Sequence, residues 1–84
     1  MVKNGIRHIV GLDVGSTTVK GIVVCTASGA IVWKDYQRHE TRQAETVLDF
    51  LDRIITETGT AGRELQVLIT GSGARTIAPI IGAR

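Results

Sequence analysis

The sequence is poor in cysteine, proline and aromatic residues. Its 84 residues include one cysteine, one proline and one each of phenylalanine, tryptophan and tyrosine. A single cysteine excludes an internal disulfide framework and a metal site built only from cysteines. So few aromatic side chains provide no stacking platform for bases, and the net charge of +2 comes from scattered basic residues rather than a patch. We therefore expect no nucleic-acid partner.

Long apolar runs are also missing. No run approaches the ~20 residues that a membrane-spanning helix needs, and the N-terminus lacks the basic and then apolar pattern of a signal peptide. We therefore expect a cytoplasmic protein with no membrane partner. The remaining composition, 43% hydrophobic and 21% charged residues, is that of an ordinary globular domain.

The spacing of apolar residues predicts three strands and then a helix. Residues 8–14, 18–26 and 31–38 are separated by short turns containing Gly, Ser and Thr, which is typical of an antiparallel meander. Both faces of 31–38 mix apolar and polar residues, which favours an edge strand. Over residues 42–58, apolar residues recur at intervals of three and four and predict an amphipathic helix. Its expected buried face comprises Ala44, Val47, Leu48, Leu51, Ile54, Ile55 and Thr58.

A fourth strand and the start of a second helix complete the predicted order. Thr41 is expected to cap the first helix and Gly59 to end it. Residues 65–70 form a short apolar strand after this crossover helix, so we expect it to run parallel to the first strand. The resulting α/β order is β-β-β-α-β-α in a mixed sheet, truncated after the fourth strand. We therefore expect residues 1–84 to be a single, incomplete N-terminal subdomain of a longer protein.

One carboxylate lies within the apolar first strand, just before a turn rich in hydroxyl groups. Asp13 is near the C-terminal end of the strand, where ligands gather in α/β sheets, and Gly15, Ser16, Thr17 and Thr18 follow it. The backbone N–H groups and hydroxyls of such a turn can cradle phosphate oxygens. An acid beside a phosphate is repulsive unless Mg²⁺ lies between them. The pattern therefore predicts a magnesium-phosphate site, with a solvated aspartate on a polar hairpin turn as the alternative.

A second glycine-rich turn follows the fourth strand and consists of Thr70, Gly71, Ser72 and Gly73. If the first and fourth strands are parallel, both turns emerge at the same edge of the sheet, which indicates one ligand between them. A flexible strand-to-helix turn is the alternative. Lys20 would add a positive charge near the first turn. The sequence contains neither a Walker loop nor a dinucleotide-binding fingerprint.

Three other residues with reactive side chains are expected to be structural. Cys25 ends the run Ile-Val-Val-Cys and is expected to be a small core residue. His8 and His39 have no cysteine or acidic partner at metal-ligand spacing, so both are expected to be strand-end residues.

The stretch IVGLDVGSTTVKGIVV resembles the first phosphate motif of the actin-like ATPase superfamily, which includes sugar kinases, actin and heat-shock chaperones. The predicted element order is similar to the ribonuclease H-like half-domain of that superfamily. More narrowly, GLDVGSTTVK, a third strand ending in YQRH, a helix and LITGSG together resemble the activators of 2-hydroxyacyl-CoA dehydratases, also called CoA-substrate-specific enzyme activases. The resemblance covers nearly all of the chain.

The resemblance implies a mechanism for a full-length parent protein. Two half-domains would clamp Mg-ATP, and hydrolysis would close a homodimer that holds one [4Fe-4S] cluster and passes an electron to a partner 2-hydroxyacyl-CoA dehydratase. The family's cluster cysteines, second phosphate motif and adenosine pocket lie downstream and are not in this chain. We therefore expect the parent to be an ATP hydrolase and this chain alone to be inactive.

The resemblance also assigns roles to individual residues. Asp13 would be the catalytic residue and the metal ligand, holding Mg²⁺ through water. The residues expected to bind ATP are Gly15, Ser16, Thr17 and Thr18 at the β- and γ-phosphates, Lys20 nearby, and Thr70, Gly71, Ser72 and Gly73 along the cleft near the γ-phosphate. Activators of this family commonly have an aromatic residue where Ser72 stands here.

Two other functions remain compatible with these motifs. One is a sugar or small-acid kinase of the same superfamily, which would transfer the γ-phosphate to its substrate. The other is an actin-like assembly module, which would polymerise with ATP and act on no small substrate. Sequence beyond residue 84 would separate them, since cluster cysteines indicate an activator and a substrate-binding acid indicates a kinase.

Overall fold

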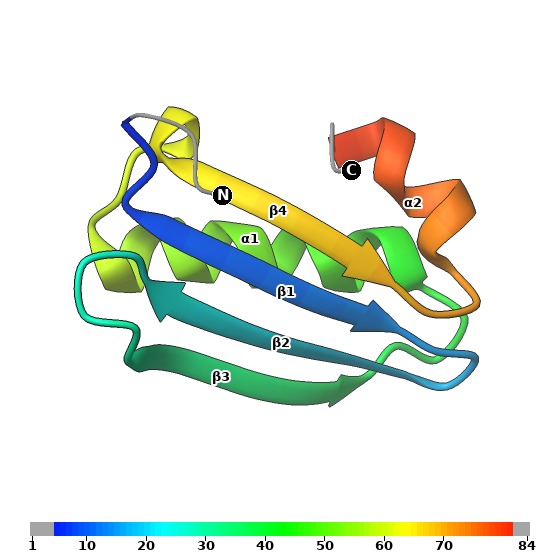
Figure 1. Ribbon diagram of the computed structural model, residues 1–84. Coiled ribbons are helices and arrows are strands. Elements are labelled where there is room, and N and C mark those ends of the chain that lie inside the picture. The colour runs from blue at the N-terminus through cyan, green and yellow to red at the C-terminus, as the bar shows by residue number, and fades with distance from the viewer. Residues whose placement is uncertain (1–4, 82–84) are drawn as a thin grey trace.

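The computed structural model describes residues 5–81 and shows a four-stranded sheet with a long helix across one face (Figure 1). The strands are β1 (His8–Val14), β2 (Thr18–Cys25), β3 (Ile31–Arg38) and β4 (Leu65–Thr70), and the helices are α1 (Gln43–Thr58), the short 3-10 helix η1 (Gly62–Glu64) and α2 (Ala74–Ile81). The predicted order β-β-β-α-β-α is therefore confirmed, with each predicted strand and α1 bounded within one residue of the expected limits.

The sheet is mixed, with the strand order β3-β2-β1-β4. Strand β2 is antiparallel to β1 and β3, whereas β4 runs parallel to β1. Because β1, β3 and β4 point the same way, three connections meet at one edge of the sheet (Figure 1). We call this the loop edge; it comprises the β1–β2 turn (15–17), the β3–α1 corner (39–42) and the β4–α2 loop (71–73).

The core lies between the sheet and α1. Alternate residues of β1 and β2 face the helix, because side chains on a strand alternate between its two faces. The ring of Phe50 on α1 rests over Gly21, where an added Cβ would lie 2.9 Å from the ring. Trp33 meets Phe50 edge to face, with 5.6 Å between ring centroids. The fully buried apolar residues are Val10, Leu12, Val14, Val19, Val23, Val47, Phe50, Ile54 and Ile77.

The buried face of α1 differs from the predicted one. Phe50 is fully buried although the spacing argument left it out, whereas Leu48 and Ile55 are 49% and 39% exposed. The apolar residues of α1 cover a wider arc of the helix than the sheet can bury. Because Gly21 has no side chain, the Phe50 ring fits over it at the centre of the contact between α1 and the sheet. The predicted face is therefore wrong at its flanks.

The two predicted helix caps have different outcomes. Gly59 ends α1 in the left-handed conformation, with φ 68°, and its N–H donates to the carbonyl of Ile55, as predicted. Thr41 does not cap the helix, because Arg42 occupies the N-cap position and makes no capping bond with its side chain. The first turn of α1 is instead tied to the loop edge by Gln43, whose Nε2 donates to the Gly15 carbonyl.

An ion pair ties the edge strand β3 to α1. Arg53 Nη2 lies 2.6 Å from Asp35 Oδ2, and the guanidinium stacks over the rings of Trp33 and Phe50. Partial burial favours the neutral acid, but hydrogen bonds from Arg53, the Tyr36 N–H and Gln37 outweigh it and lower the pKa of Asp35. The pair therefore stabilises the fold while the carboxylate is ionised.

We expect Asp35→Asn to lower the free energy of unfolding by about 1 kcal/mol at neutral pH, a value discounted for partial exposure. Because the pKa of Asp35 is lower in the folded state, this contribution is present above the unfolded pKa of about 4 and is lost as pH falls through the lower folded pKa. Urea unfolding across that acidic range should show the difference in free energy of unfolding between the unchanged protein and Asp35→Asn falling toward zero as pH is lowered. A difference that stays constant with pH would contradict this role. Asp49→Asn is the matched control, because Asp49 pairs with the same arginine, Arg53.

Candidate functional site

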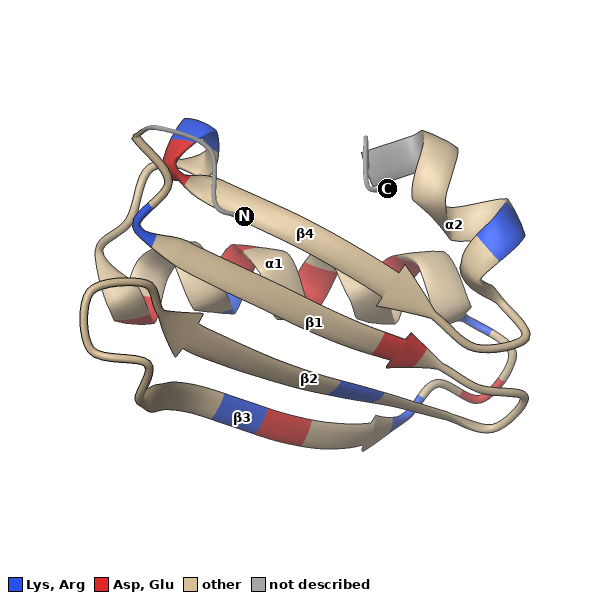
Figure 2. Ribbon diagram, in the orientation of Figure 1, with Lys and Arg blue, Asp and Glu red and all other residues tan. Residues whose placement is uncertain are grey.

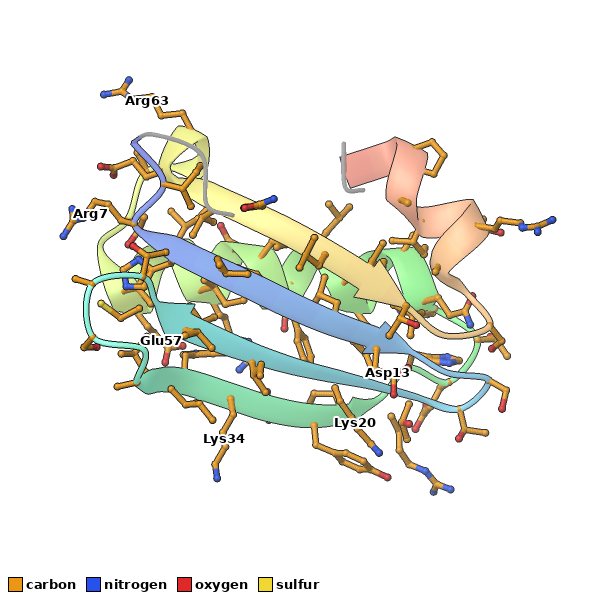
Figure 3. The ribbon with its side chains drawn as sticks, in the orientation of Figure 1. Arg7, Asp13, Lys20, Lys34, Glu57 and Arg63 are labelled. Carbon is orange, nitrogen blue, oxygen red and sulfur yellow. The ribbon has the colours of Figure 1, made fainter. Side chains whose placement is uncertain are left out.

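Asp13 lies on the face of the sheet opposite α1, near the loop edge (Figure 3). Its side chain is exposed, whereas Leu12 and Val14 on either side of it point into the core. Figure 2 shows it as the acidic residue at the end of β1, beside a β4 that carries no charge. The acid predicted on an apolar strand is thus presented to solvent at the predicted end of the sheet.

The β1–β2 turn next to Asp13 presents backbone donors to solvent. The N–H of Gly15 donates to the carbonyl of Thr18 at 2.8 Å, which closes the turn. Within residues 5–81, the N–H groups of Ser16 and Thr17 donate to no protein acceptor, and both residues are exposed. Free N–H groups beside hydroxyl side chains form the kind of concave donor set that binds anions.

The β4–α2 loop lies directly against this turn. Strand register places Thr70 beside Asp13, and the Gly73 N–H donates to the carbonyl of Val14 at 2.9 Å. A Cβ on Gly71 would lie 2.3 Å from the Val14 oxygen and 2.7 Å from Asp13 Oδ1. Gly71 also has φ +99°, a conformation that side chains rarely adopt. The backbones of the two loops are thus in direct contact, which leaves no room for a side chain at Gly71.

Lys20 faces the same side of the sheet as Asp13 and is its register partner on β2 (Figure 3). Its Nζ lies 5.7 Å from the centroid of the Tyr36 ring, a cation–π arrangement that holds the ammonium over β3. The lysine is exposed. Its place in the site stays a prediction.

A hollow of about 330 Å³ runs along this open face beside Asp13. It exists because Gly11 has no side chain between Ile22 and Leu68, its register partners on β2 and β4. The walls are apolar, and Asp13, Lys20 and Thr70 form the polar end nearest the loop edge. The polar groups of the site thus stand at one end of an apolar surface.

His39 and Gln43 are site residues that the sequence argument missed. His39 follows β3 as predicted, but it is 4% exposed and its Nε2 lies 2.9 Å from the carbonyl oxygen of Gly15. The Nε2 of Gln43, in the first turn of α1, donates to the same oxygen at 2.9 Å. Both side chains therefore contact the turn that carries the predicted site.

The donor set at the loop edge fits a metal bound together with an anion. Within residues 5–81, no cluster of three or more His, Cys, Asp or Glu side chains is arranged to hold a metal ion. Mg²⁺ commonly binds through one or two carboxylates and substrate phosphates and keeps several waters. A single exposed carboxylate, Asp13, beside a donor-rich turn matches that pattern.

Cys25 is not the core residue that the sequence predicted. It ends β2 at the edge of the sheet far from Asp13 and is partly exposed. Hydrogen bonds from the side chain and backbone of Ser28 lower the pKa of its thiol. One cysteine cannot supply the four thiolates of a [4Fe-4S] cluster, so the residues of this chain do not form such a site.

Comparison with solved structures supports the fold and the resemblance. The "Activator of the 2-Hydroxyisocaproyl-CoA Dehydratase from Clostridium difficile with bound ADPNP" matches 82% of this chain with 28% identity and a TM-score of 0.64. A "reductive activator for corrinoid, iron-sulfur protein" matches 89% with 14% identity and a TM-score of 0.70. A 2-dehydro-3-deoxygalactonokinase from Sinorhizobium meliloti matches 79% with 16% identity and a TM-score of 0.57.

These comparisons confirm the expected fold class, an α/β domain of order β-β-β-α-β-α with a mixed sheet. They also confirm the resemblance to dehydratase activators that the motifs indicated. The chain spans 25%, 16% and 21% of the lengths of the three matched structures. No protein-family model matches the sequence, and no curated protein matches it.

The described residues contain no helix long and apolar enough to cross a membrane. The longest, α1, has 16 residues and carries charged side chains along its outer side.

Proposed function

We propose that this chain is the first phosphate-binding part of an ATPase that activates a 2-hydroxyacyl-CoA dehydratase. The observation that carries the proposal is the packing of two glycine-rich loops against each other at Asp13. The activator from Clostridium difficile has a solved structure with bound ADPNP and shares 28% identity with this chain, compared with 16% for the kinase. Identity therefore favours the activator over the kinase.

Each residue at the loop edge has a proposed task. The N–H groups and hydroxyls of Ser16 and Thr17 bind the β- and γ-phosphates, with Gly15 and Thr18 closing the turn. Asp13 would hold Mg²⁺ through water, and the bound ion would supply positive charge to the phosphates. Lys20 adds positive charge to the site.

The second loop borders the same site. Thr70, Gly71, Ser72 and Gly73 line the site near the γ-phosphate, where their small side chains admit the nucleotide. Gly71 and Gly73 also keep that loop in contact with Val14.

The wider assembly is part of the proposal. Residues 1–84 form one N-terminal subdomain, and a second subdomain closes the cleft from the other side. The complete protein is a homodimer whose [4Fe-4S] cluster is held by residues outside this chain. Its partner is a 2-hydroxyacyl-CoA dehydratase, and its place is the cytoplasm.

Calorimetry on the full-length protein tests this function. We expect ADPNP to bind in the presence of Mg²⁺ and to bind at least about tenfold more weakly when EDTA removes the ion. ATP should then be hydrolysed with no sugar or acid acceptor present. Absence of nucleotide binding would overturn the proposal, and turnover that requires a small-molecule acceptor would identify a kinase instead.

A further inference from the structure

The β3–α1 corner is hydrogen-bonded to the β1–β2 turn through His39. The ring Nε2 lies 2.9 Å from the Gly15 carbonyl oxygen, and the His39 backbone N–H donates to the carbonyl of Thr17 at 3.1 Å. The ring Nδ1 accepts the N–H of Thr41 at 3.1 Å. Because Nδ1 is an acceptor, the proton of the neutral ring is on Nε2, which therefore donates to Gly15.

Gln43 adds a second donor to the same carbonyl. Its Nε2 lies 2.9 Å from the Gly15 oxygen and would lie 2.9 Å from a Cβ added to Gly73. Gln43 therefore contacts both glycine-rich loops at once. A carbonyl oxygen that accepts two side-chain hydrogen bonds is fixed in direction more firmly than one bonded only to water.

These bonds determine where the N–H groups of the turn point. A trans peptide unit is planar, so its C=O and the N–H of the next residue point in opposite directions. The Gly15 carbonyl is held toward His39 and Gln43, which turns the N–H of Ser16 away from the interior. The Thr17 carbonyl accepts the His39 backbone N–H, so the N–H of Thr18 points away from His39.

The backbone of the corner is strained in a way that serves this contact. Glu40 and Thr41 both have positive φ, 49° and 68°, although neither is glycine. Such conformations cost energy and persist where surrounding contacts enforce them. The two residues turn the chain back so that the Thr41 N–H meets the ring of His39.

We propose that His39 and Gln43 are positioning residues that aim the N–H of Ser16 in the β1–β2 turn by fixing the Gly15 carbonyl. The inference rests on the proposed nucleotide function. It assigns to the β3–α1 corner and the first turn of α1 a part in nucleotide affinity that does not require either side chain to touch the nucleotide.

Two substitutions of His39 separate positioning from simple packing. In His39→Asn, the shorter amide can still accept the Thr41 N–H, as asparagine does two residues ahead in a turn, but it cannot reach Gly15. In His39→Gln, the longer amide can still donate to the Gly15 carbonyl. We expect His39→Asn to weaken Mg-ADPNP binding about tenfold and His39→Gln to stay within about threefold of the unchanged protein.

A third variant, Gln43→Leu, removes the other donor and should also weaken Mg-ADPNP binding several-fold. Gln37→Ala is the control, because it removes an exposed amide of β3 that bonds Asp35 rather than the turn. All four variants are measured by calorimetry on the full-length protein, with urea unfolding beside each. If His39→Asn does not fold, His39→Gln and Gln43→Leu still test the positioning role.

The outcomes distinguish this inference from the proposed function. If the unchanged protein binds no Mg-ADPNP, the proposed function fails. If it binds, and both His39 variants weaken binding equally or neither does, the positioning role is overturned. The same holds if Gln43→Leu binds like the unchanged protein.

Discussion

Replacing Asp13 with asparagine in the full-length protein is expected to reduce Mg²⁺-dependent ATP hydrolysis at least about a hundredfold. The carboxylate is the proposed magnesium ligand, and an amide of the same size carries no charge to hold the ion. Because the side chain is exposed, stability should change by less than about 0.5 kcal/mol. Steady-state hydrolysis at saturating Mg²⁺, with urea unfolding beside it, measures both effects.

Asp52→Asn is the matched control for this prediction. It removes an exposed acid from α1, on the opposite side of the sheet from Asp13, and should leave hydrolysis unchanged. Unchanged turnover in Asp13→Asn would refute the metal role of Asp13. A loss of turnover that goes with a loss of folded protein would assign the residue to the fold instead.

Gly71→Ala is expected to destabilise the fold by about 3 kcal/mol or more and to abolish nucleotide binding at temperatures where the variant is still folded. Two costs add here. Alanine at φ +99° costs about 1–2 kcal/mol, and its Cβ would lie 2.3 Å from the backbone oxygen of Val14. A rigid backbone atom cannot yield as a flexible side chain can, so the two loops must move apart beside Asp13.

Gly29→Ala measures the first cost, that of a positive φ, without the second. Gly29 has φ +73°, but a Cβ there would meet nothing within 4 Å. We expect a loss of only about 1 kcal/mol and no effect on nucleotide binding. Thermal or urea unfolding compares the pair directly, and similar losses for Gly29→Ala and Gly71→Ala would contradict the close packing of the two loops.

Much of the fold could be predicted because the strands follow simple local patterns. The β1–β2 turn and the crossover helix require β4 to be parallel to β1, which brought Asp13 and Gly71 together in the prediction. The buried face of α1 was harder to predict, because Phe50 is selected by the space above Gly21 and that space is a tertiary feature. Cys25 was predicted to be buried because it lies in an apolar run. It is partly exposed because it is the last residue of β2, where the strand extends past the helix that covers the rest of the sheet.

The roles of His39 and Gln43 left no periodic signal in the sequence. Each acts through a hydrogen bond to a residue more than twenty positions away in the chain. Topology does offer a signal, however: in an antiparallel meander the third strand ends at the same edge as the first. A polar residue directly after β3 is therefore placed beside the β1–β2 turn, and that argument would have found His39.

We have proposed that the two glycine-rich loops at Asp13 bind the phosphates of a magnesium-bound nucleotide. Amide chemical shifts of the ¹⁵N-labelled full-length protein, followed as Mg-ADPNP is added, test it most directly. We predict that within residues 5–81 the largest shifts fall on Ser16, Thr17, Gly71 and Ser72 and vanish when EDTA is added. Shifts confined to the opposite edge of the sheet, or no shifts at saturating nucleotide, would contradict it.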